Sequence, residues 1–166
     1  MSAPRLYTTV ASPIGELLLV GDGRRLSGLY MVEGRRPMSA RSEWTLAPES
    51  FDGVRGQLDD YFAARRTTFD VPLTMEGTPF QLRVWSALQE IPYGETTSYG
   101  EIARRVGEPS AARAVGLANG SNPIAVIVPC HRVIGASGKL TGYGGGLERK
   151  RTLLDLERGL TTLGVT

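Results

Sequence analysis

The sequence predicts an α+β protein in two parts: a small N-terminal α/β domain with an antiparallel sheet, and a mainly helical C-terminal domain with a winged-helix-like helix-turn-helix. Two observations predict this division. Strand-like runs separated by turn residues fill the first third of the 166-residue chain. Three helix start signals then follow one another from residue 78. We therefore expect the domains to span residues 1–77 and 78–166.

The composition is that of a globular protein, with 41% hydrophobic and 22% charged residues. No apolar run approaches the ~20 residues that span a bilayer, and the start, MSAPRLYTTV, lacks the plan of a signal peptide. We therefore expect a cytoplasmic protein without membrane contact. A single cysteine permits neither an internal disulfide nor a cysteine-rich zinc site. We expect no metal and no cofactor.

The charge is divided unevenly between the two parts. Residues 1–78 carry 9 basic and 10 acidic side chains, whereas residues 79–166 carry 10 basic and 7 acidic ones. This modest basic excess indicates an anionic partner for the C-terminal part.

The N-terminal part is predicted to be a β-meander followed by a helix. Its strand-like runs are interrupted at residues 12–15 (SPIG) and 21–23 (GDG), which are good turn sequences. Apolar residues then recur at helical spacing from about Ser50 to Ala64. They are Phe51, Val54, Leu58, Tyr61 and Phe62. No catalytic pattern is present in this half, so we interpret it as a supporting domain.

The C-terminal part begins with a capping box, formed by Thr78 and Gln81 around a proline at the first helical position. The apolar stripe of this helix ends before Pro92 and consists of Phe80, Val84, Leu88 and Ile91. A second capping box, Ser98–Glu101, should open a helix through residue 106 that Gly107 ends.

A third helix is expected from Ser110 to Asn119, with Gly120 as its stop. The two short helices joined by a tight turn have the outline of a helix-turn-helix, which other helix pairs share.

This third helix, SAARAVGLANG, consists almost entirely of small residues. A helix that recognises bases in the major groove needs several long polar side chains, and only Arg113 and Asn119 qualify. Small residues instead favour close approach to the minor groove, with recognition of shape and phosphates and little sequence preference. Close packing against a neighbouring helix explains the same residues. Arg113 is either a solvated cation or a side chain that enters the base stack.

The only cysteine and the only histidine, Cys130 and His131, are adjacent in the stretch VPCHRVIG. A cysteine reacts as its thiolate and needs a cation, a base or oriented dipoles to ionise near neutral pH. The preceding apolar run, PIAVIVPC, predicts a buried strand. Neighbouring residues of a strand point to opposite sides, so we expect a bridging water between the two side chains unless the backbone bends there. A free cysteine is also often only a small buried hydrophobic residue.

Glu157 lies on the apolar side of a predicted helix, LERKRTLLDLERGL, where an unpaired carboxylate is unfavourable. His131 is a fitting partner because a catalytic histidine needs a group that orients it, and Arg132 is the competing partner.

Between His131 and Glu157 lies LTGYGGG, which is not a phosphate-binding loop because no Gly-Lys-Ser/Thr follows. Its glycines either let backbone amides approach a ligand or form a flexible connector.

With these motifs in view, the sequence resembles the O6-alkylguanine-DNA alkyltransferases, also called methylated-DNA–protein-cysteine methyltransferases. The resemblance covers about residues 78–158. The matching motifs are Pro129–Val133, Ser98–Tyr99, Ala112–Gly116, Asn122–Pro123, Gly142–Gly146 and Glu157. Gly144 departs from the pattern because some relatives have a serine there.

The resemblance implies a role for each matching residue. Cys130 would accept the alkyl group, His131 would act as a base through water, and Glu157 would orient His131. The other implied catalytic residues are Asn122, which would brace the turn before the active site, and Tyr99, which would assist nucleotide rotation and donate a proton toward the leaving guanine. The implied DNA contacts are Arg113, as the finger that replaces the extruded base, with Ser98, Tyr99, Ala112, Ala114 and Gly116. The implied guanine pocket comprises Asn119, Val133, Tyr143, Gly144 and Gly145.

The function implied is direct reversal of DNA damage. O6-alkylguanine is flipped out of the duplex, and its alkyl group passes irreversibly to Cys130 in a single turnover. The expected partner is double-stranded DNA, bound by a monomer through the minor groove. The sequence leaves open the preferred alkyl size, activity on O4-alkylthymine and cooperative binding along DNA. The alternatives are a non-catalytic binder of alkylated DNA, which in that related group lacks the cysteine, a sequence-specific regulator, and a cysteine hydrolase.

Overall fold

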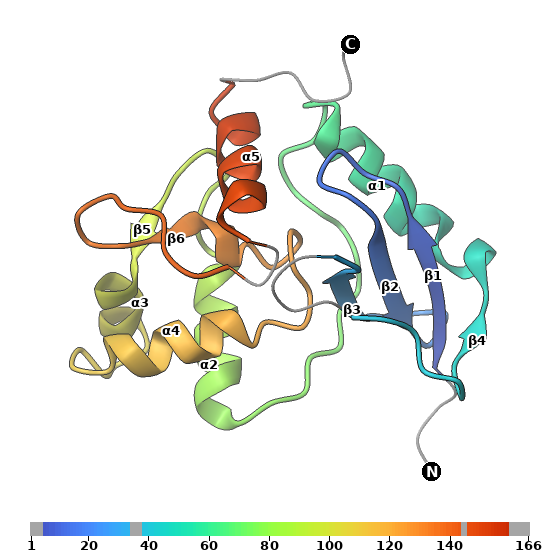
Figure 1. Cartoon of the computed structure of the whole chain (residues 1–166). Coiled ribbons are helices and arrows are strands. Elements are labelled where there is room, and N and C mark those ends of the chain that lie inside the picture. Colours follow the sequence, from blue (N-terminus) through green and yellow to red (C-terminus); the bar gives the residue numbers. More distant parts are fainter. Residues whose placement is uncertain (1–4, 34–37, 144–145, 160–166) are drawn as a thin grey trace.

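The N-terminal half of the computed structural model folds as a four-stranded sheet beside one helix, and the structure describes residues 5–33, 38–143 and 146–159. Strands β1 (Leu6–Val10), β2 (Leu17–Gly21) and β3 (Leu26–Met31) form the expected antiparallel meander. The short β4 (Thr45–Leu46) pairs in parallel with β1, giving the order β3-β2-β1-β4. The helix follows as a 3-10 turn, η1 (Pro48–Phe51), and α1 (Asp52–Phe62), which lies beside the sheet (Figure 1).

The C-terminal half contains four helices and a small two-stranded sheet within the described residues. Helix α2 (Pro79–Leu88) has the predicted capping box, because the Thr78 side chain and the Gln81 side chain each accept a bond from the other's backbone N–H. Strands β5 (Thr97–Ser98) and β6 (Val133–Ile134) pair in parallel, and α5 (Leu147–Glu157) is the last helix described.

The helix-turn-helix consists of α3 (Tyr99–Arg105) and α4 (Ala112–Gly120), which pack against each other and against α2 (Figure 1). Gly107 follows α3 with a φ of +85°, a conformation that glycine adopts at little cost, so the predicted stop is correct. The second capping box is only half formed. Ser98 accepts a bond from the Glu101 backbone, but the Glu101 side chain pairs with Arg104 and Arg105 instead.

The limits predicted for the third helix are wrong by one or two residues. Helix α4 begins at Ala112 rather than Ser110, and it includes Gly120 instead of stopping before it. Ser121 caps the end of the helix, and its backbone N–H and its hydroxyl both donate to the carbonyl of Leu117.

The apolar run before Cys130 is not the strand that we predicted. Residues 124–129 form successive turns, with Val126 at a φ of +69°, and Cys130 begins a 3-10 turn, η2 (Cys130–Arg132). Asn122 provides the physical reason. Its side chain accepts from the Ile124 N–H (3.0 Å) and donates to the Val128 carbonyl (2.8 Å), bonding two backbone groups that a strand would offer to a neighbour.

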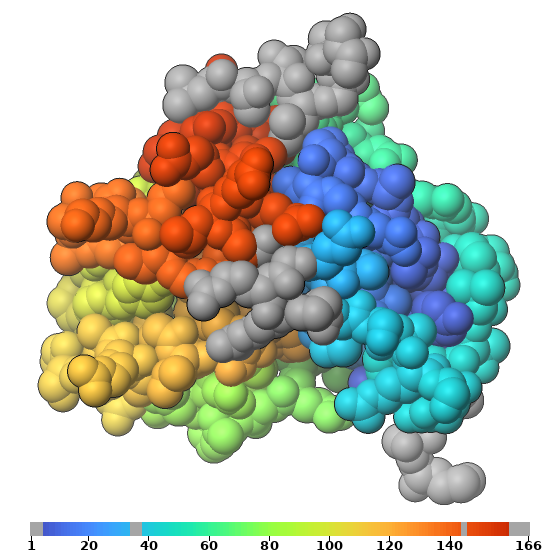
Figure 2. All heavy atoms as spheres, viewed as in Figure 1, coloured from blue at the N-terminus to red at the C-terminus, as the bar shows by residue number. Residues whose placement is uncertain are grey.

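The two halves share one core, which runs from the face of the sheet to the helices around Cys130. The edge strand β3 also bonds to the C-terminal half, because the Leu29 N–H donates to the Pro123 carbonyl and its carbonyl accepts from the Ala125 N–H. Figure 2 shows the blue-to-cyan N-terminal half meeting the yellow-to-red C-terminal half across the molecule.

None of the helices in the described ranges has the length and apolar character that a membrane crossing requires.

The capping box generates a first prediction. Replacing Thr78 with alanine removes the acceptor for the Gln81 N–H and should lower the free energy of unfolding by about 1 kcal/mol, whereas T78S, which keeps a hydroxyl, should remain close to wild type. Urea denaturation followed by circular dichroism measures the difference. If T78A and T78S are equally stable, the cap does not stabilise α2.

Candidate active site

Cys130 lies at a cavity of about 210 Å³ between the two halves of the molecule. Its thiol is free and buried, and burial raises its pKa. A hydrogen bond from the Asn122 side chain, the positive charge of Lys150 and the backbone N–H of Cys130 itself act in the opposite direction. The cavity walls include Leu29, Met31, Asn119, Asn122, Gly142 and Tyr143.

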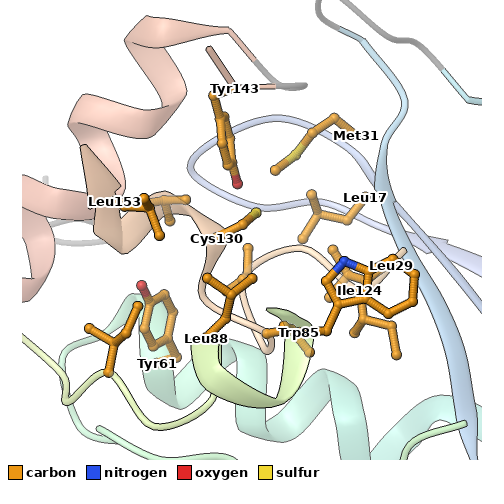
Figure 3. Packing of buried hydrophobic residues seen from close by; sticks show 14 of the residues in the cluster. Leu17, Leu29, Met31, Tyr61, Trp85, Leu88, Ile124, Cys130, Tyr143 and Leu153 are labelled. Carbon is orange, nitrogen blue, oxygen red and sulfur yellow. The ribbon is translucent and has the colours of Figure 1, made fainter. Parts of the chain in front are cut away.

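The cavity is predominantly apolar, with polar groups buried close by. In Figure 3 the hydroxyl of Tyr143 points toward Cys130, and Leu17 and Met31 approach from the sheet. Neither this hydroxyl nor the Asn119 side-chain oxygen has a hydrogen-bond partner in the described part of the protein. The Asn119 amide group donates to the Cys130 carbonyl (3.3 Å). An apolar cavity with a few polar groups is typical of a small-ligand site.

His131 is completely buried, and its Nε2 lies 2.7 Å from Oε2 of Glu157. An ionised carboxylate only accepts hydrogen bonds, so the proton of the neutral ring is on Nε2. Burial lowers the pKa of His131, and the nearby Arg132 and Lys150 add to this, while Glu157 opposes it. The ring is therefore neutral near pH 7, with an unprotonated Nδ1 that has no partner among the described residues.

Glu157 pairs with both of the partners that the sequence offered as alternatives. Arg132 donates from Nε to Oε1 (2.8 Å) and from Nη2 to Oε2 (3.0 Å), a bidentate ion pair. The Gly94 N–H adds a long bond to Oε1 (3.4 Å), and the Tyr61 hydroxyl donates to Oε2 (2.6 Å). Hydrogen bonds from His131 and Arg132, together with the charge of Arg132, hold the pKa of Glu157 far below its usual range despite burial.

Lys150 is a second buried cation beside the cavity, and it has no side-chain exposure. Its ammonium group donates to the carbonyls of Val133 (2.6 Å) and Thr141 (2.7 Å), so it joins β6 to the segment before Tyr143. Burial lowers the pKa of Lys150 to about 8. The lysine thus joins the two segments that follow Arg132 and precede Gly142, and it supplies positive charge near the thiol.

The helix-turn-helix presents a partly apolar surface beside the site. Arg113, Ala114 and Leu117 are exposed on α4, whereas Val115 and Ala118 are buried against the core. Ala112 is half-buried at the start of the same helix, and Ser98 caps α3.

Tyr99 lies where α3 meets this surface. Its hydroxyl is within 2.8 Å of the Thr141 hydroxyl. A Cβ added at Gly116 would lie 3.8 Å from the Tyr99 ring, an ordinary contact, so packing against this ring does not require a glycine there.

The structure brings most of the predicted residues into one region. Cys130, Asn119, Asn122 and Tyr143 line the cavity, and His131, Glu157 and the buried Val133 lie behind it. Gly144 and Gly145 lie outside the described residues. Arg113 is exposed on α4 rather than in the cavity.

Sequence reasoning missed Tyr61, Lys150 and Met31. Tyr61 and Met31 come from the half interpreted as purely supporting, and both occupy ordinary apolar positions of a helix and a strand. Lys150 gave a usable signal, because it lies four residues before Leu154 and seven before Glu157 and therefore shares their helix face.

A buried thiol, a neutral imidazole held by a carboxylate and an adjoining helix-turn-helix define a class of protein that combines cysteine nucleophile chemistry with a nucleic-acid-binding scaffold. Residues 79–159 match the family model described as "6-O-methylguanine DNA methyltransferase, DNA binding domain". Residues 6–75 match "6-O-methylguanine DNA methyltransferase, ribonuclease-like domain". The chain belongs to the 6-O-methylguanine DNA methyltransferase family. The domain boundary that we propose between residues 77 and 78 falls in the gap between the two matches.

Individual relatives agree with this assignment over nearly the whole chain. The methylated-DNA–protein-cysteine methyltransferase of Mycobacterium tuberculosis is 60% identical over 160 residues, which cover 96% of each protein. The enzyme of that name from Methanosarcina acetivorans is 54% identical over 151 residues, or 91% of this chain and 97% of the relative. The crystal structure of Mycobacterium tuberculosis OGT in complex with DNA superimposes with a TM-score of 0.88 at 61% identity, covering 93% of both chains.

The neutral state of His131 predicts a loss of stability in acid. Below about pH 6.5 the unfolded chain binds a proton at this residue that the folded protein does not, so the free energy of unfolding falls as the pH drops. The slope from this residue approaches about 1.4 kcal/mol per pH unit. His131→Gln keeps an N–H donor but cannot titrate. Between about pH 7 and pH 5 its free energy of unfolding should therefore depend less steeply on pH than that of wild type.

Urea denaturation of both proteins at each pH measures the effect. Glu157 does not contribute in this window, because its pKa is lowered and its stabilisation is lost only at more acidic pH. An equal slope for wild type and H131Q would show that His131 binds its proton at the same pH in the folded and the unfolded protein, which contradicts a lowered pKa.

Proposed function

We propose that this protein repairs DNA by transferring the alkyl group of O6-alkylguanine to Cys130. The observation that carries the proposal is the thiol at an apolar cavity, next to a histidine whose neutral form leaves Nδ1 free as a base. The family assignment and the similarity to a relative solved in complex with DNA support the same reaction.

The proposed reaction is an in-line displacement at the alkyl carbon. Cys130 loses its proton through a water molecule to Nδ1 of His131, and the positive charge of Lys150 favours the thiolate. The sulfur–carbon bond forms as the carbon–O6 bond breaks, and the electron pair leaves with guanine. Tyr99, whose hydroxyl is partly buried beside Thr141, donates a proton toward the leaving base. The thioether product has no carbonyl for water to attack, so each molecule reacts once.

The base must leave the duplex to reach a buried thiol, at a cost of a few kcal/mol. We assign this step to α4, where Arg113 is exposed and takes the place of the extruded base. Ala114 is exposed and small, so it lets the backbone of α4 approach a minor groove closely. Such an interface recognises the shape and the phosphates of DNA, so we propose that the protein has little sequence preference. We also propose that it is a monomer and that it acts in the cytoplasm.

We propose that the cavity accepts the flipped guanine. The polar atoms of Asn119 and Tyr143 that lack partners in the described structure are available to a polar base, and the apolar wall formed by Leu29 and Met31 suits an alkyl group. The presence of Cys130 argues against the alternative of a non-catalytic binder of alkylated DNA.

Mass spectrometry tests the transfer directly. After incubation with a duplex containing O6-methylguanine, the peptide with Cys130 should gain the mass of one methyl group, up to one equivalent per protein. Cys130→Ser should gain none but should still bind the duplex, and a duplex with unmodified guanine provides the second control. Wild-type protein that binds the damaged duplex without this mass gain would contradict the proposal.

Arg113→Ala tests the flipping step. Without the side chain that fills the gap, the rate on a paired O6-methylguanine should fall about ten-fold, equivalent to about 1.4 kcal/mol of the flipping cost. The rate on free O6-benzylguanine, which needs no flipping, should stay unchanged. Single-turnover kinetics on the two substrates measures both rates, and equal losses would argue against the assigned role.

A further inference from the structure

Tyr61 brings the N-terminal half into contact with the catalytic residues. It lies near the end of α1, is fully buried, and donates its hydroxyl proton to Oε2 of Glu157 over 2.6 Å. The two residues are 96 positions apart in the sequence. Figure 3 shows the hydroxyl directed away from the helix that carries the ring.

The position of this hydroxyl is fixed by aromatic neighbours. The Tyr61 ring is edge-on to Phe62 and Tyr93, with centroid distances of 5.2 and 6.2 Å, and tilted against Phe69 at 5.3 Å. A ring held on several sides keeps its hydroxyl in one place, so the bond to Glu157 does not depend on a mobile side chain.

The hydrogen bond from Tyr61 reduces the negative charge that the Glu157 carboxylate presents to His131. Oε2 of Glu157 accepts from Tyr61, from Arg132 and from Nε2 of His131 at the same time. A carboxylate has about four acceptor sites in all, so each added donor withdraws negative charge from the others. Without the Tyr61 hydroxyl, more of that charge would act on the imidazole and favour its protonated form.

We propose that Tyr61 is a positioning residue for alkyl transfer, whose hydrogen bond to Glu157 keeps His131 neutral and its Nδ1 free to accept the proton of Cys130. The inference rests on the proposed function and assigns the N-terminal half a part in it. A protonated imidazole has no free lone pair, so it cannot act as the base.

Several other groups set the charge around His131, and all of them remain when only the Tyr61 hydroxyl is removed. Arg132 on η2 and Lys150 on α5 oppose protonation of the imidazole. Two tyrosines interact electrostatically with Glu157: Tyr93 on the loop after α2 and Tyr143 on the segment before α5. Cys130 is adjacent to His131 in the sequence. A change in the titration of His131 in Tyr61→Phe therefore reports the missing hydroxyl.

The test is the pH dependence of single-turnover methyl transfer from an O6-methylguanine duplex to the full-length protein. In Y61F the acid limb of the profile should move to higher pH by about 0.5 to 1 unit, because His131 becomes more basic. On this limb the rate of Y61F should be about three- to ten-fold lower than that of wild type at the same pH, because the fraction of neutral His131 falls about ten-fold for each unit by which its pKa rises. A role for Tyr61 in packing alone would lower the melting temperature without moving the limb.

Tyr93→Phe is the matched control. Its ring packs against Tyr61 and under the guanidinium of Arg132, but among the described residues its hydroxyl makes no bond to Glu157. The acid limb of Y93F should coincide with that of wild type. An acid limb in Y61F that also coincides with wild type would overturn the inference.

The experiment distinguishes failure of the proposed function from failure of the role of Tyr61. If wild-type protein takes up no methyl group, the proposed function is wrong. If it takes up a methyl group but wild type and Y61F have identical pH–rate profiles, only the role of Tyr61 is wrong. If Y61F does not fold, 3-fluorotyrosine at position 61 keeps the ring and hydroxyl but donates more strongly. Its acid limb should move to lower pH, and an unchanged limb would again overturn the inference.

Discussion

The buried carboxylate of Glu157 is the group on which the arrangement of the site depends. It accepts from a histidine and an arginine of η2 and from a tyrosine of α1, and each of these groups is itself buried. A buried charge is tolerated only when it is paired and hydrogen-bonded. Because the donors saturate Glu157, the carboxylate stays ionised, and an ionised Glu157 fixes the tautomer of His131. The chemistry available to Cys130 follows from that tautomer.

The backbone around Cys130 makes this geometry possible. Asn122 bonds the backbone on both sides of the turn after α4, so the apolar run folds back and ends in a 3-10 turn instead of a strand. Cys130 then borders the cavity, while His131 and Arg132 reach the carboxylate behind it. The same run bonds to the edge of the N-terminal sheet through Leu29, which ties the position of the thiol to both halves.

Local signals predicted much of this structure. The cap at Thr78, the glycine after α3 and the turns of the meander each depend on a few neighbouring residues, and each is where the sequence indicated. The unfavourable burial of an unpaired carboxylate pointed to Glu157 and its two partners. The strand before Cys130 was predicted wrongly because a short apolar run fits a strand and a buried turn equally well. Tyr61 and Lys150 were missed because their roles come from tertiary contacts, and their positions resemble ordinary helix residues.

The central claim is that His131 is neutral near pH 7, with the proton on Nε2 and a bare Nδ1. The protein has one histidine, so its two ring nitrogens can be assigned without ambiguity in a ¹⁵N-labelled sample. Nuclear magnetic resonance at neutral pH should show one protonated ring nitrogen, Nε2, and one with the chemical shift of an unprotonated nitrogen, Nδ1. Two protonated nitrogens, or a proton on Nδ1 alone, would contradict the account.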